Sequence, residues 1–243
     1  MKKLGTLYGI GIGPGDPDLI TYKGVQLLSR CTHVVVPKGS EASESVALGI
    51  IRKHLNPSAE IHEIVFPMLT RKDVLQTRWR ESAKIVGALL SNGNDVCFPT
   101  LGDAFLYSTY IYLVRALREI HPDLNIVTIP GINAFSAVAS RTEFAIGEGK
   151  HPVTIIPAAD DFSELREALQ GHGTVIIMKI GKRLDAVLDL LEEFHVLKSS
   201  VFAAHVGMPE ELVETDLRKL RGRDVETGYL SIILTKLGTE ENE

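Results

Sequence analysis

A glycine-rich segment near the start of the chain constrains its fold more than any other stretch of the sequence. Residues 9–21 read Gly-Ile-Gly-Ile-Gly-Pro-Gly-Asp-Pro-Asp-Leu-Ile-Thr and continue a short apolar run that predicts a first β-strand. Glycines in this position are typical of dinucleotide-binding folds, but the G-x-G-x-x-G fingerprint needs a third glycine where the helix begins. That position is Asp16 when counted from Gly11, and Pro14 when counted from Gly9. No Lys-Ser/Thr pair follows, so the segment is not a phosphate-binding P-loop either. It therefore indicates a loop that approaches another nucleotide-like ligand.

Apolar strand-like segments alternate with amphipathic helical segments along the whole chain. The predicted strands cover Leu4–Ile12, His33–Pro37, Ile61–Val65, Asp95–Phe98, Ile126–Ile129, Val153–Pro157, Thr174–Met178, Ser200–His205 and 229–236. The predicted helices cover Thr21–Arg30, Ser45–Leu55, Lys72–Asn92, Ala104–Ile120, Ile132–Ser140, Phe162–Gln170 and Leu184–His195. This alternation predicts parallel sheets with right-handed crossovers. Because the pattern restarts after His121, we expect two α/β domains, residues 1–121 with a parallel sheet and residues 122–243 with a mixed sheet, and a ligand in the cleft between them.

The composition excludes several classes of function. The 243 residues carry a formal net charge of −5, which argues against a nucleic-acid-binding protein because such proteins are normally basic. Cys31 and Cys97 lie in apolar contexts, which favours two buried free thiols over a disulfide and suits a reducing cytoplasm. The sequence shows no signal-peptide pattern and no apolar run near the roughly 20 residues that span a membrane. We therefore expect a cytoplasmic protein that acts on neither nucleic acids nor membranes.

Two further glycine-containing segments each follow a predicted strand. Residues 99–109 read Pro-Thr-Leu-Gly-Asp-Ala-Phe-Leu-Tyr-Ser-Thr, and residues 130–137 read Pro-Gly-Ile-Asn-Ala-Phe-Ser-Ala. In parallel α/β sheets, ligands bind at the carboxyl ends of the strands. The second segment alone is better explained by Asp103 capping the helix that follows. Three such segments in one chain, however, indicate a shared ligand site.

The three segments together resemble the signatures of the tetrapyrrole methylase family, the class III S-adenosylmethionine-dependent methyltransferases. The first resembles G-x-G-P-G-D-P-x-L-[IL]-T, the second G-D-P-x-x-Y-S-T, and the third P-G-[IV]-[ST]-[SA]-x-x-A. Two positions depart from these patterns: Ala104 stands where Pro is usual, and Asn133-Ala134 replaces a Ser-Ser or Ser-Thr pair. The resemblance covers nearly the whole chain.

Within that family the chain is most similar to the C20-methyltransferases of the cobalamin pathway, which act on precorrin-2 or its cobalt form, cobalt-factor II. Phe66-Pro67-Met68, Trp79 and the segments 108–113 and 135–139 carry this similarity.

The resemblance implies a cofactor, a methyl acceptor and an assembly. The cofactor is S-adenosyl-L-methionine, which leaves as S-adenosyl-L-homocysteine, the acceptor is the tetrapyrrole, and family members are typically homodimers. The residues implied to bind the cofactor are Pro14, Leu101, Gly102, Asp103, Leu106, Asn133, Ala134, Met178, Gly207, Tyr229 and Leu230.

Methyl transfer requires little acid–base catalysis from the protein. Methyl transfer is an in-line displacement at a sulfonium carbon, so the enzyme contributes mostly positioning. The acceptor carbon is enamine-like, and one modest base suffices to remove its proton afterwards. We expect Asp103 or Tyr107 to be that base, with Asp103 equally suited to a binding role.

The charged residues and histidines add less specific expectations. Six basic residues are candidates for holding substrate carboxylates, although a solvated face explains each as well: Arg71, Lys72, Arg78, Arg80, Arg141 and Lys150. The eight histidines show no spacing typical of a metal site, so we expect no resident metal. Any cobalt would arrive inside the substrate.

Three other functions are alternatives that the sequence leaves open. A family member could methylate a different tetrapyrrole carbon or a protein side chain. A nicotinamide-dependent oxidoreductase is disfavoured because Val36-Pro37-Lys38-Gly39 ends the second strand without the acidic residue that such enzymes need there. A non-catalytic small-ligand sensor is the third alternative. The sequence does not decide whether the substrate contains cobalt.

Overall fold

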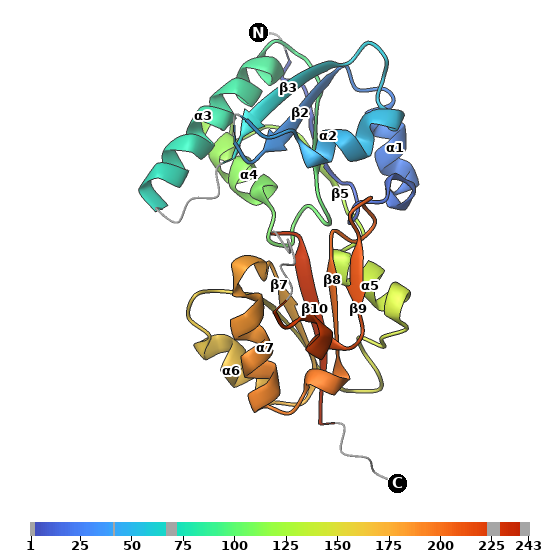
Figure 1. Ribbon diagram of the computed structural model, residues 1–243. Helices are drawn as coiled ribbons and strands as arrows, with labels where there is room; N and C mark the ends of the chain where they lie inside the picture. Colours follow the sequence, from blue (N-terminus) through green and yellow to red (C-terminus); the bar gives the residue numbers. More distant parts are fainter. Residues whose placement is uncertain (1–2, 41, 67–71, 223–228, 239–243) are drawn as a thin grey trace. The chain divides into compact units, whose positions relative to one another are not determined.

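The chain folds into two compact units, Met1–Asn133 and Ala134–Glu243 (Figure 1). The structure, a computed structural model, describes residues 3–40, 42–66, 72–222 and 229–238. The first unit contains a five-stranded sheet in the order β3-β2-β4-β1-β5, in which every pairing is parallel. The second contains a sheet in the order β6-β7-β10-β8-β9, with both parallel and antiparallel pairings. The prediction of an α/β protein with a parallel sheet followed by a mixed one is confirmed.

The first unit places helices on both faces of its sheet (Figure 1). Its strands are β1 (Leu7–Gly11), β2 (His33–Lys38), β3 (Glu60–Val65), β4 (Val96–Thr100) and β5 (Ile126–Ile129). Its helices are α1 (Tyr22–Leu28), α2 (Val46–Ile51), α3 (Lys72–Ser91) and α4 (Thr109–Ile120). The central strand β4 is buried along its whole length, as expected for a parallel strand covered on both faces.

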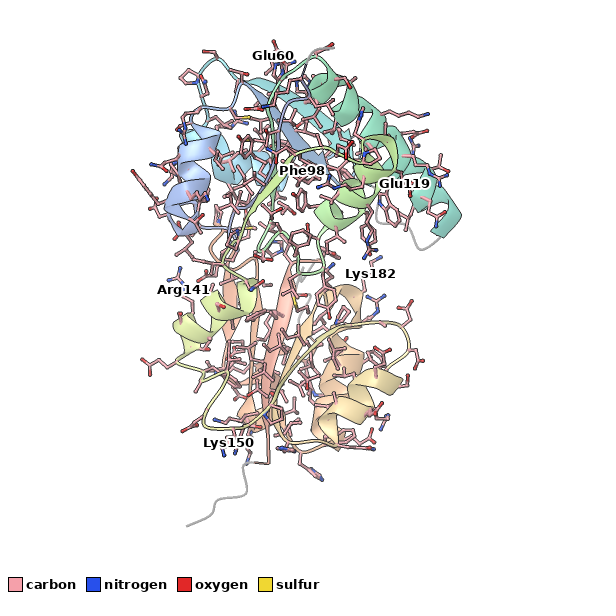
Figure 2. All side chains as sticks on the ribbon, turned by 180° about the vertical axis from the view of Figure 1, so that it is seen from behind. Glu60, Phe98, Glu119, Arg141, Lys150 and Lys182 are labelled. Carbon is pink, nitrogen blue, oxygen red and sulfur yellow. The ribbon has the colours of Figure 1, made fainter. Side chains whose placement is uncertain are left out.

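Local sequence explains where these helices begin and which face they bury. The hydroxyls of Thr21 and Ser45 accept hydrogen bonds from backbone amides in the first turns of α1 and α2, which caps both helices. Helices α3 and α4 pack on one face through a shared core in which Phe98, Tyr110 and Leu113 are fully buried. Figure 2 shows Phe98 among these core side chains.

The second unit builds a core on each face of its mixed sheet. Its strands are β6 (Val153–Pro157), β7 (Gly173–Met178), β8 (Ser200–Ala204), β9 (Leu212–Glu214) and β10 (Ser231–Leu237), and its helices are α5 (Ala134–Thr142), α6 (Ser163–Leu169) and α7 (Leu184–Glu193). Ile177 and Ile233 face the core that includes α6 and α7, whereas Ile176 and Ile232 face the core that includes α5. This alternation follows the two-residue period of a strand.

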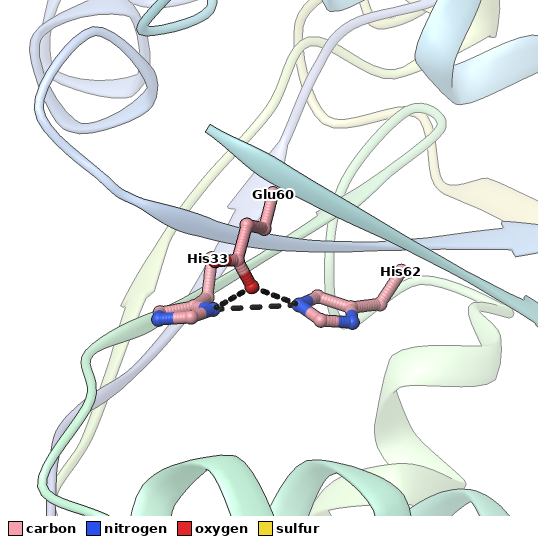
Figure 3. A group of neighbouring side chains, drawn as sticks. All are labelled: His33, Glu60 and His62. Atoms are coloured by element: carbon pink, nitrogen blue, oxygen red, sulfur yellow. Dashed lines mark hydrogen bonds and ion pairs between the residues drawn. The ribbon is translucent and has the colours of Figure 1, made fainter. Parts of the chain in front are cut away.

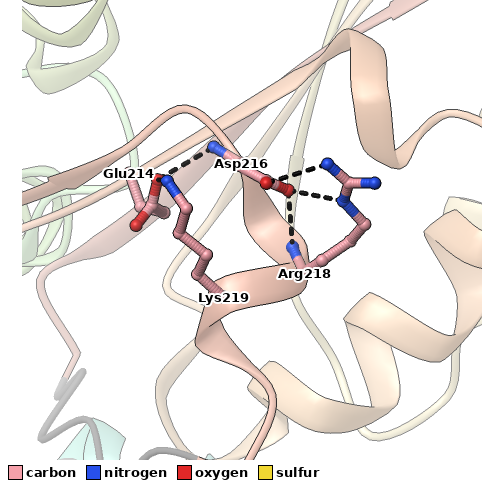
Figure 4. A network of polar contacts seen from close by, with 4 residues as sticks. All are labelled: Glu214, Asp216, Arg218 and Lys219. Atoms are coloured by element: carbon pink, nitrogen blue, oxygen red, sulfur yellow. Dashed lines mark hydrogen bonds and ion pairs between the residues drawn. The ribbon is translucent and has the colours of Figure 1, made fainter.

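A polar network closes the corner after β9 (Figure 4). Asp216 caps the short 3₁₀ helix that follows by accepting a hydrogen bond from the Arg218 backbone amide, and it also pairs with the Arg218 guanidinium at 2.7 Å. Glu214 accepts a hydrogen bond from the Asp216 amide and lies 3.6 Å from the ammonium of Lys219. These contacts hold the backbone between β9 and the short 3₁₀ helix.

Three expectations need correction. The boundary lies after Asn133 rather than after His121, because β5 pairs with β1 and so belongs to the first sheet. The helix expected from Ala104 begins at Thr109, capped by Ser108, since residues 104–108 form a turn. Strand β9 was missed because three residues carry too little periodicity to reveal a strand.

Cys31 and Cys97 are buried and free, as predicted. Pro67, Met68 and Arg71 lie outside the described residues, as does the side chain of Lys72. Among the helices that the structure describes, none is long and apolar enough to cross a membrane.

Candidate functional site

The three glycine-containing segments meet at the carboxyl ends of β1, β4 and β5. The first two are joined by a pair of backbone hydrogen bonds: the Gly13 amide donates to the Gly102 carbonyl at 3.3 Å, and the Gly102 amide donates to the Gly13 carbonyl at 2.7 Å. Both glycines have positive φ, 78° and 68°, a region that glycine enters without a steric penalty. The first two segments are therefore joined to each other through their backbones.

The third segment packs against the other two at distances that only glycine permits. A Cβ atom on Gly131 would lie 2.1 Å from the Gly102 carbonyl oxygen, and one on Gly11 would lie 2.5 Å from the Gly131 nitrogen. A Cβ atom on Gly102, by contrast, would meet no atom within 4 Å. The glycines at 11 and 131 thus serve the packing of the loops on each other, whereas Gly102 faces open space.

Asp103 ties the second segment to the third. One carboxylate oxygen accepts a hydrogen bond from the Phe105 amide at 2.8 Å, and the other accepts one from the Gly131 amide at 2.9 Å. The helix that follows is capped instead by Ser108, so the cap reading of Asp103 is wrong. Hydrogen bonds from backbone amides to a carboxylate are among the stronger ones in proteins. Asp103 is therefore placed to position the loops.

The turn between Asp103 and α4 holds strained backbone. Tyr107 has φ 50°, which is unfavourable for an aromatic residue, and its side chain is exposed. Directly after it, the buried hydroxyl of Ser108 lies 2.9 Å from that of Thr100. Strain of this kind persists where the surrounding structure enforces it, often at functional sites.

Tyr110, which follows Ser108 at the start of α4, is a core residue. Its ring is fully buried, and a Cβ on Gly9 would lie 2.1 Å from it. Its hydroxyl is 2.8 Å from the Thr128 hydroxyl, and burial raises the pKa of the phenol. Gly9 thus makes room for an aromatic ring inside the sheet core.

A second group of expected cofactor residues gathers at one edge of the second unit's sheet. Met178 ends β7, and its register partner Ile232 lies near the start of β10. Just before β10, Leu230 accepts a hydrogen bond from the His205 amide at 2.9 Å, which brings the segment after β8 alongside. Gly207 follows with φ 80°, and its amide donates to Glu211 at 2.6 Å. The register therefore brings these three segments of the second unit together.

The expected residues thus fall into two groups. Pro14, Leu101, Gly102, Asp103, Leu106 and Asn133 belong to the loops of the first unit, and Ala134, Met178, Gly207, Tyr229 and Leu230 belong to the second. Ala134 and Met178 pack against the same core.

Sequence reasoning did not single out Lys179, which has the most distinctive electrostatics at this edge. Burial lowers the pKa of its ammonium to about 8. Its Nζ lies 4.7 Å from the centre of the Tyr229 ring, its backbone has φ 60°, and its amide donates to the Ser231 carbonyl. A lysine with a pKa near 8 exists partly as the free amine at neutral pH and can accept a proton.

Two basic residues of the first unit that were expected near a substrate already have acidic partners. Arg78 pairs with Glu81 at 3.2 Å, and Arg80 lies 3.6 Å from Glu119. These pairs are exposed and favour the solvated-face reading.

The two basic residues of the second unit that were expected near a substrate, Arg141 and Lys150, lie apart from each other. Arg141 lies 3.6 Å from Glu211, the residue that also binds the Gly207 amide, and so links α5 to the segment after β8. Lys150 is exposed and lies at the other end of the unit from Arg141 (Figure 2).

The histidine spacing indicated no metal motif, but the strand register assembles a group of possible ligands. His33, Glu60 and His62 bring one donor atom each within 4.8 Å of one another. Residues 29 positions apart cannot be paired from spacing alone, and only the pairing of β2 with β3 reveals this group.

Comparison with known proteins identifies relatives along most of the chain. Residues 6–221 match a sequence model described as Tetrapyrrole (Corrin/Porphyrin) Methylases. The chain is 30% identical over 230 residues to the cobalt-precorrin-2 C(20)-methyltransferase of Salmonella typhimurium, covering 95% of each chain. It is 26% identical over 239 residues to the precorrin-2 C(20)-methyltransferase of a Sinorhizobium species, again covering 95% of each.

The fold is shared by solved structures, among them two methyltransferases. A cobalt precorrin-4 methyltransferase superposes with a TM-score of 0.73 at 22% identity, covering 95% of this chain and 94% of the other. The uroporphyrin-III C-methyltransferase of Thermus thermophilus, solved with S-adenosylhomocysteine, gives a TM-score of 0.67 at 16% identity, covering 96% and 92%.

Proposed function

Because the chain belongs to the tetrapyrrole (corrin/porphyrin) methylases, we propose that it transfers a methyl group from S-adenosyl-L-methionine to C20 of precorrin-2 or of its cobalt form in cobalamin biosynthesis. One structural observation carries the proposal: three loops are locked together at the carboxyl ends of a parallel sheet, and one glycine among them faces open space. We infer the methyl acceptor from the names of the two relatives that match along 95% of their length, of which one acts on the cobalt form.

The loop residues fit a nucleotide-like cofactor. Because Gly102 has no side chain, the space beside its α-carbon is open. A ligand could therefore approach the backbone closely at this position. Leu101 and Leu106, both half-buried beside it, would supply apolar walls for the adenine ring. In the second unit, Met178 and Leu230 would provide apolar contacts, and Tyr229 an aromatic one. Asp103 would act indirectly, because both of its oxygens hold loop backbone in place.

The protein's part in the reaction is mainly orientation. S-adenosyl-L-methionine supplies the methyl group: its S–CH₃ bond breaks as the C–C bond to the acceptor forms, and the sulfonium becomes the thioether of S-adenosyl-L-homocysteine. Rigid loops keep donor and acceptor aligned, and a misplacement of about 1 Å is enough to lower a rate by about 100-fold. The proton of C20 then leaves.

We propose Lys179 as the group that accepts that proton at Nζ. Its pKa of about 8 leaves a usable fraction of free amine near neutral pH, and it lies at the sheet edge with Met178 and Tyr229. Asp103 is less suited, because both of its oxygens already accept hydrogen bonds. Tyr107 remains a second candidate: its exposed phenol sits on the strained turn of the second loop.

A labelled methyl-transfer assay tests the proposal. The purified chain is incubated with S-adenosyl-L-methionine carrying a deuterated methyl group and, in separate reactions, with precorrin-2 and with its cobalt form under anaerobic conditions. We expect the product to gain one labelled methyl group, located at C20 by NMR. Labelling at another carbon would assign the chain to a different reaction of the family. No labelling of either tetrapyrrole would refute the proposed activity.

The family resemblance also supports a homodimer in the cytoplasm as the working form. Light scattering after size-exclusion chromatography measures the assembly directly, and a mass equal to the 26.6 kDa of one chain would contradict the dimer. Fractionation of expressing cells tests the location, since recovery in the membrane fraction would contradict it.

A further inference from the structure

A group of two histidines and a glutamate lies on the edge strand β3 of the first unit's sheet and on its neighbour β2 (Figure 3). His33 begins β2, Glu60 begins β3, and the two are register partners in a parallel pair. Partners in a parallel pair face the same side of the sheet, and His62, two residues beyond Glu60, faces that side as well. The three side chains therefore converge at the amino ends of their strands. The glycine loops of this unit follow the carboxyl ends of its strands, so the two places are distinct.

The distances within this group fit a metal ion better than they fit hydrogen bonds. His33 Nδ1 lies 3.4 Å from His62 Nε2 and 3.5 Å from Glu60 Oε2, and His62 Nε2 lies 3.9 Å from Glu60 Oε2. Hydrogen bonds between such atoms normally span roughly 2.7–3.2 Å. The point in the plane of the three atoms that is equidistant from them lies about 2.1 Å from each, which is the usual length of a zinc–nitrogen or zinc–carboxylate bond.

The donor types and their burial also suit a transition metal. Two neutral imidazoles and one carboxylate form a ligand set that binds zinc in proteins with a water in the fourth position. The imidazoles of His33 and His62 are largely buried, at 15% and 28% exposed, whereas the carboxylate of Glu60 is 69% exposed. The rings would thus be held in place, and the exposed glutamate would leave a path for the ion.

We propose that His33, Glu60 and His62 bind a divalent late first-row transition metal, with zinc as the main candidate. Such an ion would cross-link the amino ends of β2 and β3 and so tie the edge strand to the sheet. This proposal does not depend on the methyl-transfer activity. It stands on the donor set and on the spacing of the three donor atoms.

Zinc titration of the metal-free, untagged chain tests the site. Calorimetry at about pH 7.5 compares the unmodified chain with Glu60→Gln and His62→Gln. We expect one zinc per chain, with affinity weakened at least about tenfold in each variant, since even the loss of outer-shell partners weakens metal sites by about 10–100-fold. His151→Gln is the matched control, because it removes an imidazole of the second unit and leaves this group intact. Zinc should also raise the unfolding temperature of the unmodified chain and of the control.

Cobalt(II) gives an independent readout through visible absorption bands whose intensity reports a low-coordinate site. We expect the bands in the unmodified chain and in the control, and their loss in Glu60→Gln, whose exposed side chain makes misfolding an inadequate explanation. Because Cys31 and Cys97 are present in every variant, zinc held by thiols would survive the substitutions. Equal zinc affinity in all variants, or no saturable binding by the unmodified chain, would overturn the proposal.

Discussion

Gly131→Ala tests whether the three loops pack as closely as the structure shows. The new Cβ would lie 2.1 Å from the Gly102 carbonyl oxygen and 2.7 Å from the carbonyl carbon of Gly11. Both neighbours are backbone, so no side chain can rotate away to relieve the contact. Reaching an ordinary contact distance requires the loops to separate by about 1 Å, which also stretches the hydrogen bond from Gly131 to Asp103.

Two effects set how much Gly131→Ala lowers the free energy of unfolding. Forcing an extra methyl group into a packed site destabilises by about 1–3 kcal/mol. Loss of a hydrogen bond to a charged group adds about 1.5–3 kcal/mol. We therefore expect Gly131→Ala to lower the free energy of unfolding by about 3–5 kcal/mol. A loop displacement of about 1 Å should also reduce methyl transfer by about 100-fold.

Urea unfolding followed by circular dichroism measures the stability change. Gly49→Ala is the matched control, because its Cβ would meet no atom within 4 Å and it lies inside α2. That substitution should leave stability unchanged or raise it by up to about 1 kcal/mol, since alanine favours the helix over glycine. If Gly131→Ala unfolds within about 1 kcal/mol of the unmodified chain, the close packing of the loops is wrong.

Two further substitutions separate positioning from proton transfer. Asp103→Asn removes one of the two backbone hydrogen bonds that the carboxylate accepts, so it should lower the free energy of unfolding by about 2 kcal/mol and weaken S-adenosylhomocysteine binding. Methyl transfer should persist at saturating cofactor. Complete loss of transfer with unchanged binding would make Asp103 the base instead. Lys179 must be neutral to accept a proton, so kcat should rise with pH through about 8, and Lys179→Met should abolish that rise. An unchanged pH profile in Lys179→Met would exclude Lys179 as the base.

The sequence predicted the sheets because strand and helix periodicities are local properties. The alternation was enough for a parallel sheet followed by a mixed one. The domain boundary was misplaced because periodicity does not say which sheet a strand joins, and β5 crosses back to pair with β1. The start of α4 was misplaced because 104–108 is apolar enough to extend the helical pattern, whereas Ser108 provides the cap.

The candidate site was predictable only in outline. The glycine motifs located the three loops, but the reason for each glycine emerged from contacts between loops, as for Gly131 against Gly102. The role of Asp103 depends on an amide 28 residues away, which no local pattern reveals. The lowered pKa of Lys179 arises from burial, and the group around His33 arises from strand register. Both are tertiary properties.

Calorimetry with S-adenosyl-L-homocysteine tests whether the loops around Gly102 bind the methyl donor. The unmodified chain should bind one molecule saturably. Gly102→Ala should bind at least about tenfold more weakly, because its methyl group occupies the space the ligand needs, while stability falls only by about 1–2 kcal/mol for an alanine at positive φ. No binding by the unmodified chain, or equal binding by Gly102→Ala, would show that these loops do not form the binding site of the methyl donor.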